Sequence, residues 1–231
     1  MKTIGLIGGM SWESTALYYR LLNEHTKARL GGLHSARIAM VSVDFAEIEA
    51  MQQAGDWDAA GAALAGAGRA VEAAGADLLV LCTNTMHRVA PAIEAAVGIP
   101  LLHLADATAR RIRAAGVTRV GLLGTRFTME QDFYRARLEA HGLQVDVPEA
   151  ADREIVHRVI YDELCLGEIR DASRREYLRI IDDLTARGAE GVIEGCTEIT
   201  LLVGPEHTAA RLFDTTAIHA EVAVEEALSS G

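Results

Sequence analysis

One stretch of the sequence reads Leu78-Leu79-Val80-Leu81-Cys82-Thr83-Asn84-Thr85, an apolar run that ends in a cysteine and three polar residues. A second stretch repeats the arrangement, from Gly191-Val192-Ile193 to Gly195-Cys196-Thr197-Glu198. Each apolar run predicts a buried strand, and a helical pattern follows each cysteine. The N–H groups of a strand-to-helix turn and the helix dipole favour a thiolate, so each turn suits a reactive cysteine. Two such turns predict two thiols that face one substrate, as a two-base proton transfer requires.

Short runs rich in β-branched residues alternate with longer amphipathic stretches along the chain, which is typical of parallel βαβ units. We expect strands near 3–7, 37–43, 78–81, 100–104, 119–123, 143–146, 191–194 and 211–213. We expect helices near 14–29, 57–74, 85–97, 106–115, 130–141, 173–187 and 216–229. The sequence therefore predicts an α/β fold whose sheets are covered by helices on both faces.

An internal repeat divides this pattern into two halves. Three pairs match in order, at offsets close to half the chain length: Ile4–Gly8 with Val120–Gly124, Cys82-Thr83 with Cys196-Thr197, and Asp106 with Asp214. We expect two pseudo-symmetric α/β halves, each with a parallel sheet of about four strands. Residues 1–113 and 215–231 would form the half that carries Cys82, and residues 114–214 the half that carries Cys196. Functional groups gather at the carboxyl ends of parallel strands, so we expect the two cysteines on opposite walls of one cleft.

The composition indicates an ordinary globular protein. Half of the 231 residues are hydrophobic and 24% are charged, which excludes a disordered chain. The net charge of −11 argues against a nucleic-acid partner, because phosphate binding requires a basic surface. No apolar run is long enough to span a membrane, and the first residues lack the apolar core of a signal peptide. We expect a cytoplasmic protein.

The three cysteines are too few for a disulfide framework and suit a reducing compartment. No metal-ligand spacing accompanies them, so we expect no metal site. A cysteine at a strand end is commonly only a small buried hydrophobe. The polar residues that follow Cys82 and Cys196 favour catalysis over that alternative, and the reducing compartment disfavours a disulfide between the two. Cys165 lies between two leucines and is interpreted as a core residue.

Two further features leave alternatives open. His87 follows Cys82 in the predicted helix, where it either orders the loop or forms a Cys/His dyad for acyl transfer; no oxyanion motif is evident. The stretch Gly5-Leu6-Ile7-Gly8-Gly9-Met10 does not fit the dinucleotide pattern GxGxxG. We expect its N–H groups to bind a small anion such as a carboxylate instead.

The paired cysteine motifs, His87 and the opening stretch Ile4–Met10 together resemble the aspartate/glutamate racemases. The resemblance covers essentially the whole chain. It implies two Rossmann-like halves, a homodimer and an amino-acid racemase that needs no cofactor. By the same resemblance, Cys82 and Cys196 are the two acid/base thiols. The residues it assigns to substrate binding are Met10, Gln52, Thr83, Asn84, Thr85, Thr197 and Glu198.

The sequence departs from this family where the substrate side chain would bind. Aspartate racemases carry an arginine and a lysine there, whereas the corresponding residues 47–53 and 161–165 contain no cation. Arg126 or Arg158 would have to substitute. An unpaired carboxylate is costly to desolvate, so we expect aspartate, glutamate or a wider set of polar amino acids as substrates. The alternatives are a maleate isomerase, a hydantoin racemase or a non-catalytic carboxylate-binding protein, and the two retained cysteines disfavour the last.

Overall fold

The computed structural model describes residues 1–229, which divide into two compact units. The first unit comprises residues 1–104 and the C-terminal segment that begins at His219, and the second comprises Ala105–Ile218. The boundaries expected from the sequence, 113/114 and 214/215, differ from these. Helix α5 (Leu104–Ala114) accounts for the first difference, because its Asp106 accepts two hydrogen bonds from Arg137 of the second unit, at 2.8 and 2.7 Å.

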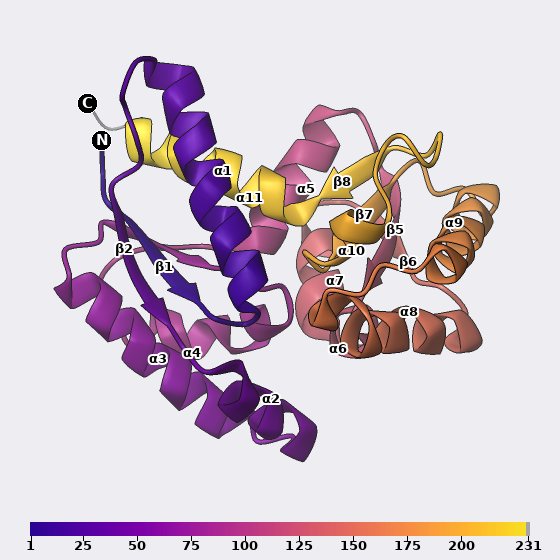
Figure 1. Ribbon diagram of the computed structural model, residues 1–231, viewed down its shortest axis with the longest axis horizontal. Helices are drawn as coiled ribbons and strands as arrows, with labels where there is room; N and C mark the ends of the chain where they lie inside the picture. Colours follow the sequence, from indigo (N-terminus) through magenta and orange to yellow (C-terminus); the bar gives the residue numbers. More distant parts are fainter. Residues whose placement is uncertain (230–231) are drawn as a thin grey trace. The chain divides into compact units, whose positions relative to one another are not determined.

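The first unit is built on a parallel sheet with the strand order β2-β1-β3-β4, of which β1 and β2 are labelled in Figure 1. Its strands are β1 (Ile4–Gly8), β2 (Ile38–Ser42), β3 (Leu78–Leu81) and β4 (Leu101–Leu102). Its helices are α1 (Trp12–Leu30), α2 (Phe45–Ala54), α3 (Trp57–Ala73), the 3-10 helix η1 (Thr85–Val89), α4 (Ala90–Glu94) and most of α11 (Thr215–Leu228).

An apolar cluster on each face of this sheet holds the helices in place. One cluster joins Leu6 and Val80 of the sheet to side chains of α1 and α11, and the other joins Ile7 and Leu81 to side chains of α3 and α4. Gly5 permits the close approach of α3, because a Cβ there would lie 2.4 Å from Cγ1 of Val71. The C-terminal helix is therefore part of the core of the first unit.

The second unit has the same construction, with the strand order β6-β5-β7-β8. Its strands are β5 (Arg119–Gly124), β6 (Gln144–Asp146), β7 (Val192–Gly195) and β8 (Leu212–Asp214), all parallel. Its helices are α5, α6 (Arg126–Glu130), α7 (Asp132–Ala140), α8 (Ala150–Asp162), the 3-10 helix η2 (Leu164–Leu166), α9 (Asp171–Ala186) and α10 (Ile199–Leu202).

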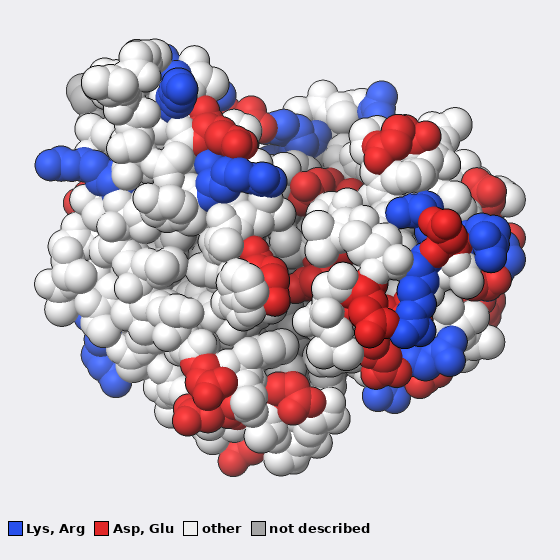
Figure 2. All heavy atoms as spheres, in the orientation of Figure 1, with Lys and Arg blue, Asp and Glu red and all other residues white. Residues whose placement is uncertain are grey.

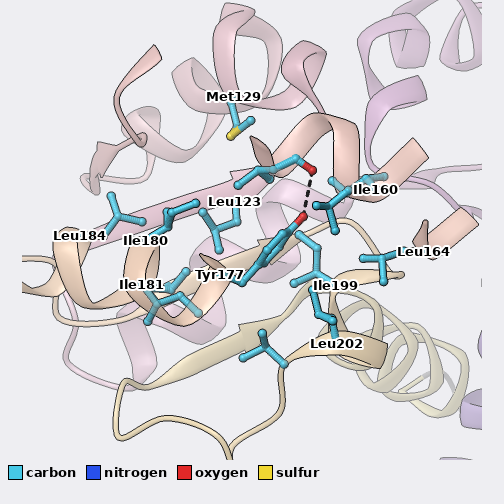
Figure 3. Close-up of a cluster of buried hydrophobic side chains, with 14 of the residues drawn as sticks. Leu123, Met129, Ile160, Leu164, Tyr177, Ile180, Ile181, Leu184, Ile199 and Leu202 are labelled. Atoms are coloured by element: carbon cyan, nitrogen blue, oxygen red, sulfur yellow. Dashed lines mark hydrogen bonds between the residues drawn. The ribbon is translucent and has the colours of Figure 1, made fainter. Parts of the chain in front are cut away.

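The core between this sheet and helices α8 and α9 is shown in Figure 3. Leu123 of β5 packs there with Ile180 and Leu184 of α9 and with Ile160 of α8. Tyr177 lies in the middle of the cluster, and its hydroxyl donates a 2.9 Å hydrogen bond to the carbonyl of Val156. The buried phenol is thus satisfied, as a polar group inside a core must be.

Within residues 1–229, the predicted α/β fold with two parallel four-stranded sheets is confirmed. Both sheets have the same strand order, so β1 corresponds to β5 and β3 to β7, in agreement with the sequence repeat. The predicted helix 85–97 is instead a 3-10 helix followed by the short helix α4. Pro91 lies at the start of α4 and has no N–H to donate, which explains why one continuous helix does not form.

The charged side chains of the second unit are mixed in sign. Figure 2 shows arginines beside acidic residues over α8 and α9, where Arg179 pairs with Asp152 and Arg187 pairs with Glu149. Among residues 1–229, no helix combines the length and the apolar character needed to cross a bilayer.

Candidate active site

Cys82 directly follows β3 in the first unit. Its N–H donates to the carbonyl of Ile7 (2.9 Å), so the strand pairing continues as far as the cysteine. Its side chain is fully buried among the residues that join the sheet to α1 and α11. Burial raises the pKa of the Cys82 thiol. Cys82 is therefore a thiol near neutral pH.

The turn after Cys82 is fixed by side chains on both sides. Ser14 Oγ donates to the Cys82 carbonyl (3.3 Å), and His87 Nδ1 lies 2.7 Å from the Thr83 carbonyl. Asn84 and Thr85 are buried in this turn, while Thr83 is half-buried. The three residues predicted to bind the substrate therefore follow the thiol in one well-ordered turn.

Gln52 and Met10, also predicted to line the site, lie beside the same turn in the first unit. The Gln52 amide donates to the thioether of Met86 (2.8 Å), and Met86 shares a buried apolar cluster with Met10. Both predicted residues are buried, and Met10 belongs to the apolar cluster on the sheet face opposite the Cys82 side chain.

The glycine turn after β1 packs on the first turn of α1. The Gly9 N–H, which we expected to bind an anion, donates to Oγ1 of Thr15 (2.8 Å). Gly9 has a φ of +95°, and a Cβ there would lie 2.2 Å from the Val43 carbonyl. Ser11 caps α1 by accepting from the Ser14 N–H (3.2 Å). This turn therefore positions Ser14 beside Cys82.

Cys196 directly follows β7 in the second unit. The preceding Gly195 pairs with Gly124 of β5, and a Cβ at Gly195 would lie 2.7 Å from the Leu123 carbonyl. The Cys196 thiol donates to Glu198 Oε2 (2.9 Å). Burial, followed by the negative charge of Glu198, raises the pKa of the Cys196 thiol. Cys196 is thus also a thiol, and a carboxylate is in place to accept its proton.

Threonine side chains after β7 and β8 form hydrogen bonds near Cys196. Thr197 Oγ1 lies 3.0 Å from Thr216 Oγ1, and Thr215 Oγ1 donates to the Glu194 carbonyl (2.8 Å). Asp214 at the end of β8 accepts from the N–H groups of Thr216 and Ala217 (2.8 and 3.0 Å). The carboxyl ends of β7 and β8 therefore form one polar edge around Cys196.

Cys165 in η2 is half-buried and packs against the same apolar cluster as Cys196. It lies near enough to Cys196 to contribute to the raised pKa of that thiol. The sequence interpretation, a core residue between two leucines, gave no sign of this proximity. Leu164 on one side is buried and Leu166 on the other is 69% exposed, so the leucine pattern around Cys165 does not describe a uniform core.

Glu194 is a buried acid that the sequence analysis did not single out. It lies in β7 beside Asp214 of β8, and its Oε1 has no hydrogen-bond partner among the described residues. Burial, followed by the charge of Asp214, raises the pKa of Glu194 to about 8. The only signal in the sequence is a glutamate inside an otherwise apolar strand, Gly191-Val192-Ile193-Glu194-Gly195.

Arg126 is the cation at the carboxyl edge of the second sheet. It opens α6 directly after Thr125, whose side chain caps that helix. Its ion pair with Glu154 is long (3.8 Å), and its Nη2 lies 3.4 Å from Nε2 of His157. Arg158, the other candidate, lies within α8; both arginines are exposed, but only Arg126 lies just after a strand end. Arg126 is thus the better placed of the two for a substrate carboxylate in this unit.

A metal site requires a cluster of ligands, and a Schiff base requires a lysine in desolvated surroundings. No group of three or more His, Cys, Asp or Glu side chains in residues 1–229 could hold a metal ion. The sequence contains two lysines, Lys2 near the start of the chain and Lys27 in the exposed last turn of α1. Lys2 is half-buried and Lys27 is exposed, so neither has the desolvated surroundings typical of a covalent-catalysis lysine.

Comparison with known proteins identifies relatives of the whole chain. The family model described as Asp/Glu/Hydantoin racemase matches residues 7–223. A crystal structure from Yersinia pestis, provisionally described as an Asp/Glu racemase, is 58% identical with a TM-score of 0.93, covering 99% of this chain and 100% of that one. An aspartate racemase homologue from Pyrococcus horikoshii OT3 is 35% identical with a TM-score of 0.86, covering 98% and 99%.

A third solved structure is similar in fold alone. The aspartate racemase of Picrophilus torridus is 19% identical with a TM-score of 0.82, and the match covers 98% of this chain and 94% of that one. The family model spans most of the sequence, and it includes both cysteine turns and the strands that lead into them. The chain belongs to the Asp/Glu/hydantoin racemase family.

Proposed function

We propose that this protein racemises amino acids without a cofactor, using Cys82 and Cys196 as the two acid/base groups. Membership of the family and the related solved structures support racemisation in general. The observation that carries the two-thiol mechanism is the equivalence of the cysteines: each directly follows the third strand in the order of its sheet, β3 in one unit and β7 in the other.

The reaction requires a base on one face of the α-carbon and an acid on the other. One thiolate would remove the α-proton, and the other cysteine, as a thiol, would return a proton to the opposite face. The two roles exchange when the opposite enantiomer is the substrate. Identical side chains suit this exchange, because each must act as the base in one direction and as the acid in the other.

Each thiol must lose its proton before it can act as a base, and Glu198 is the group that would take the proton of Cys196. Its carboxylate already accepts a hydrogen bond from that thiol. For either thiol, the ammonium group of a bound amino acid would favour the thiolate, since a nearby positive charge lowers a thiol pKa. Thr83, Asn84, Thr85 and Thr197 would hold the substrate carboxylate and ammonium groups, and Met10 and Gln52 would line the pocket.

Glu198→Gln should lower kcat/KM by about 10²-fold, because removal of a positioned proton acceptor typically costs 10²–10⁴-fold. The loss should be the same for both enantiomers, since they are equally stable and the ratio of kcat/KM values is fixed. The negative charge of Glu198 raises the pKa of Cys196. Alkylation of Cys196 should therefore begin at lower pH in the variant. Glu206→Gln, in an exposed loop of the same unit, is the control. Equal losses of kcat/KM in both variants would contradict the role of Glu198 as the proton acceptor of Cys196.

The substrate class we propose is aspartate, glutamate and a wider set of polar amino acids. The stretches 47–53 and 161–165 offer no cation to a side-chain carboxylate, and Glu163 already accepts from Ser173 Oγ (2.6 Å). The kcat/KM values for asparagine, glutamine and serine should therefore lie within about 10²-fold of the value for aspartate. An imperfectly paired side-chain carboxylate adds only a few kcal/mol of binding free energy. Initial rates by chiral chromatography test this. Strict restriction to aspartate and glutamate, abolished by Arg126→Gln, would identify Arg126 as the missing cation.

The decisive assay for the proposed function is chiral analysis of the purified protein with every proteinogenic L-amino acid and no added cofactor. Activity should survive chelator and hydroxylamine and fall on treatment with iodoacetamide, because the proposed chemistry requires free thiols and neither a metal nor a carbonyl cofactor. Loss of activity on dialysis against chelator, restored by a divalent metal, would contradict the proposal. Failure to racemise any amino acid, with turnover of maleate or a hydantoin, would assign one of the alternative activities.

Two expectations about the setting of the enzyme stay predictions. A cytoplasmic location would keep the thiols reduced, and the homodimer implied by the resemblance awaits a measurement of mass in solution. Light scattering across a range of protein concentrations would decide between a dimer and a monomer.

A further inference from the structure

Four buried rings lie together near Cys82 in the first unit, and the proposed mechanism uses none of them. They are Tyr18, His87, His103 and His219. The centroid of the His87 ring lies 4.5 Å from that of His103 and 5.9 Å from that of His219. Neighbouring imidazoles in a buried cluster cannot all carry charge at acceptable cost. Their hydrogen bonds therefore decide which nitrogen of each ring holds a proton.

The bonds of His87 fix a single neutral form. The Leu104 N–H donates to Nε2 (3.2 Å), so Nε2 must be the unprotonated nitrogen. Nδ1 lies 2.7 Å from the Thr83 carbonyl, which can only accept, so Nδ1 carries the hydrogen. A second proton on Nε2 would point at the Leu104 N–H. His87 thus links the turn after Cys82 to the segment after β4 as a neutral ring.

The bonds of His219 fix the opposite form. Its Nε2 lies 2.8 Å from the Leu102 carbonyl and must donate, so its Nδ1 accepts from the Tyr18 hydroxyl (2.9 Å). Burial lowers the pKa of His219 to about 4, so this ring is also neutral near pH 7. The segment Leu102–Leu104 is therefore held at its first carbonyl by His219 from α11 and at its last N–H by His87.

We propose that His87 is a positioning residue for Cys82, fixed as the Nδ1–H tautomer and anchored through Leu102–Leu104 to His219 and Tyr18. Two successive carbonyls after β3 are then held by side chains, that of Cys82 by Ser14 and that of Thr83 by His87. Both His87 nitrogens are engaged by backbone groups, so the ring has no nitrogen with which to deprotonate Cys82. This inference rests on the proposed function for its effect on catalysis, but its structural content is independent of it.

The tautomers can be read directly by NMR. Protein labelled with ¹⁵N-histidine should show His87 as Nδ1–H and His219 as Nε2–H in a long-range ¹H–¹⁵N correlation spectrum, with neither ring titrating between pH 6 and 8. His87→Asn and His219→Asn identify the signals. Tyr18→Phe removes the donor to His219 and should shift only the His219 nitrogens. An Nε2–H tautomer for His87, or a His87 titration that parallels activity, would overturn the proposal.

The effect on catalysis separates positioning from proton transfer. His87→Phe removes both bonds and should lower kcat by about 10²-fold with little change in KM, because small displacements of a reacting group cost about this much. His87→Asn can still donate to the Thr83 carbonyl and should recover kcat to within about 10-fold of the wild type. Equal loss in both folded variants would overturn the positioning role. A protein that racemises nothing but shows the expected tautomers would refute the proposed function and leave the anchoring intact.

Discussion

Cys82→Ala and Cys196→Ala should each lower racemisation by about 10³-fold or more, while the protein stays folded. Removing a positioned acid or base typically costs 10²–10⁴-fold, and each thiol is required for one face of the α-carbon in both directions. Both cysteines lie at strand ends whose backbone pairing does not depend on the thiol, so circular dichroism should be unchanged. Chiral chromatography of the product from L- and D-substrates measures the loss.

The single variants should also differ from one another. With one thiol removed, the other can still exchange the α-proton of the enantiomer that it faces. Cys82→Ala and Cys196→Ala should therefore catalyse slow solvent exchange of opposite enantiomers. Cys165→Ala is the matched control, because Cys165 shares an apolar cluster with Cys196 but does not follow a strand end. A folded but inactive Cys165→Ala protein would show that the pair has been wrongly assigned.

Glu194→Gln should stabilise the protein at alkaline pH. The pKa of Glu194 is about 8 in the folded protein against an ordinary value of 4.5, so the folded state binds the proton more tightly. The stability that this group contributes is present below pH 4.5 and is lost as the pH rises through about 8. A tenfold difference in proton affinity is worth about 1.4 kcal/mol, so the loss amounts to a few kcal/mol. Glutamine does not ionise, so the variant should not lose this stability as the pH rises.

Denaturant unfolding of wild type and Glu194→Gln at pH 4, 7 and 9 measures this effect. The two proteins should have similar free energies of unfolding at pH 4, and that of the variant should be higher by a few kcal/mol at pH 9. Glu190→Gln is a control of opposite sign, because the Thr118 hydroxyl and the N–H groups of Thr118 and Arg119 donate to its carboxylate and lower its pKa. If the free energies of unfolding of wild type and Glu194→Gln differ by the same amount at every pH, Glu194 is not neutral in the folded state and the prediction is wrong.

The strands and the positions of both cysteines follow from the sequence because they depend on local pattern. The apolar runs 78–81 and 191–193 are short and lie in a chain that alternates strand and helix patterns, so they predict buried strands. The cysteine after each run is then expected at the carboxyl end of its sheet. The matching order of the two sheets follows in turn from the repeat, since each half carries the same sequence of elements.

The features that the sequence did not reveal depend on contacts between distant residues. His87 acquires its role from Leu104, which lies 17 residues away and beyond a strand. The pKa of Glu194 reflects burial beside Asp214, whereas the sequence shows only one glutamate in an apolar run. Helix α5 belongs to the second unit because Arg137 binds Asp106, 31 residues away. Amphipathic pattern alone does not distinguish the sheet on which such a helix packs.

The most direct test of the two-thiol mechanism is the fate of the α-proton in D2O. When L-substrate is converted in D2O, D-product formed in the first few per cent of reaction should carry deuterium at the α-carbon, while recovered L-substrate should carry little. One base removes the proton, and a different acid, already exchanged with solvent, delivers deuterium from the other face. Mass spectrometry of the separated enantiomers gives both values. Equal early labelling of the two enantiomers would indicate one shared base and would contradict the mechanism.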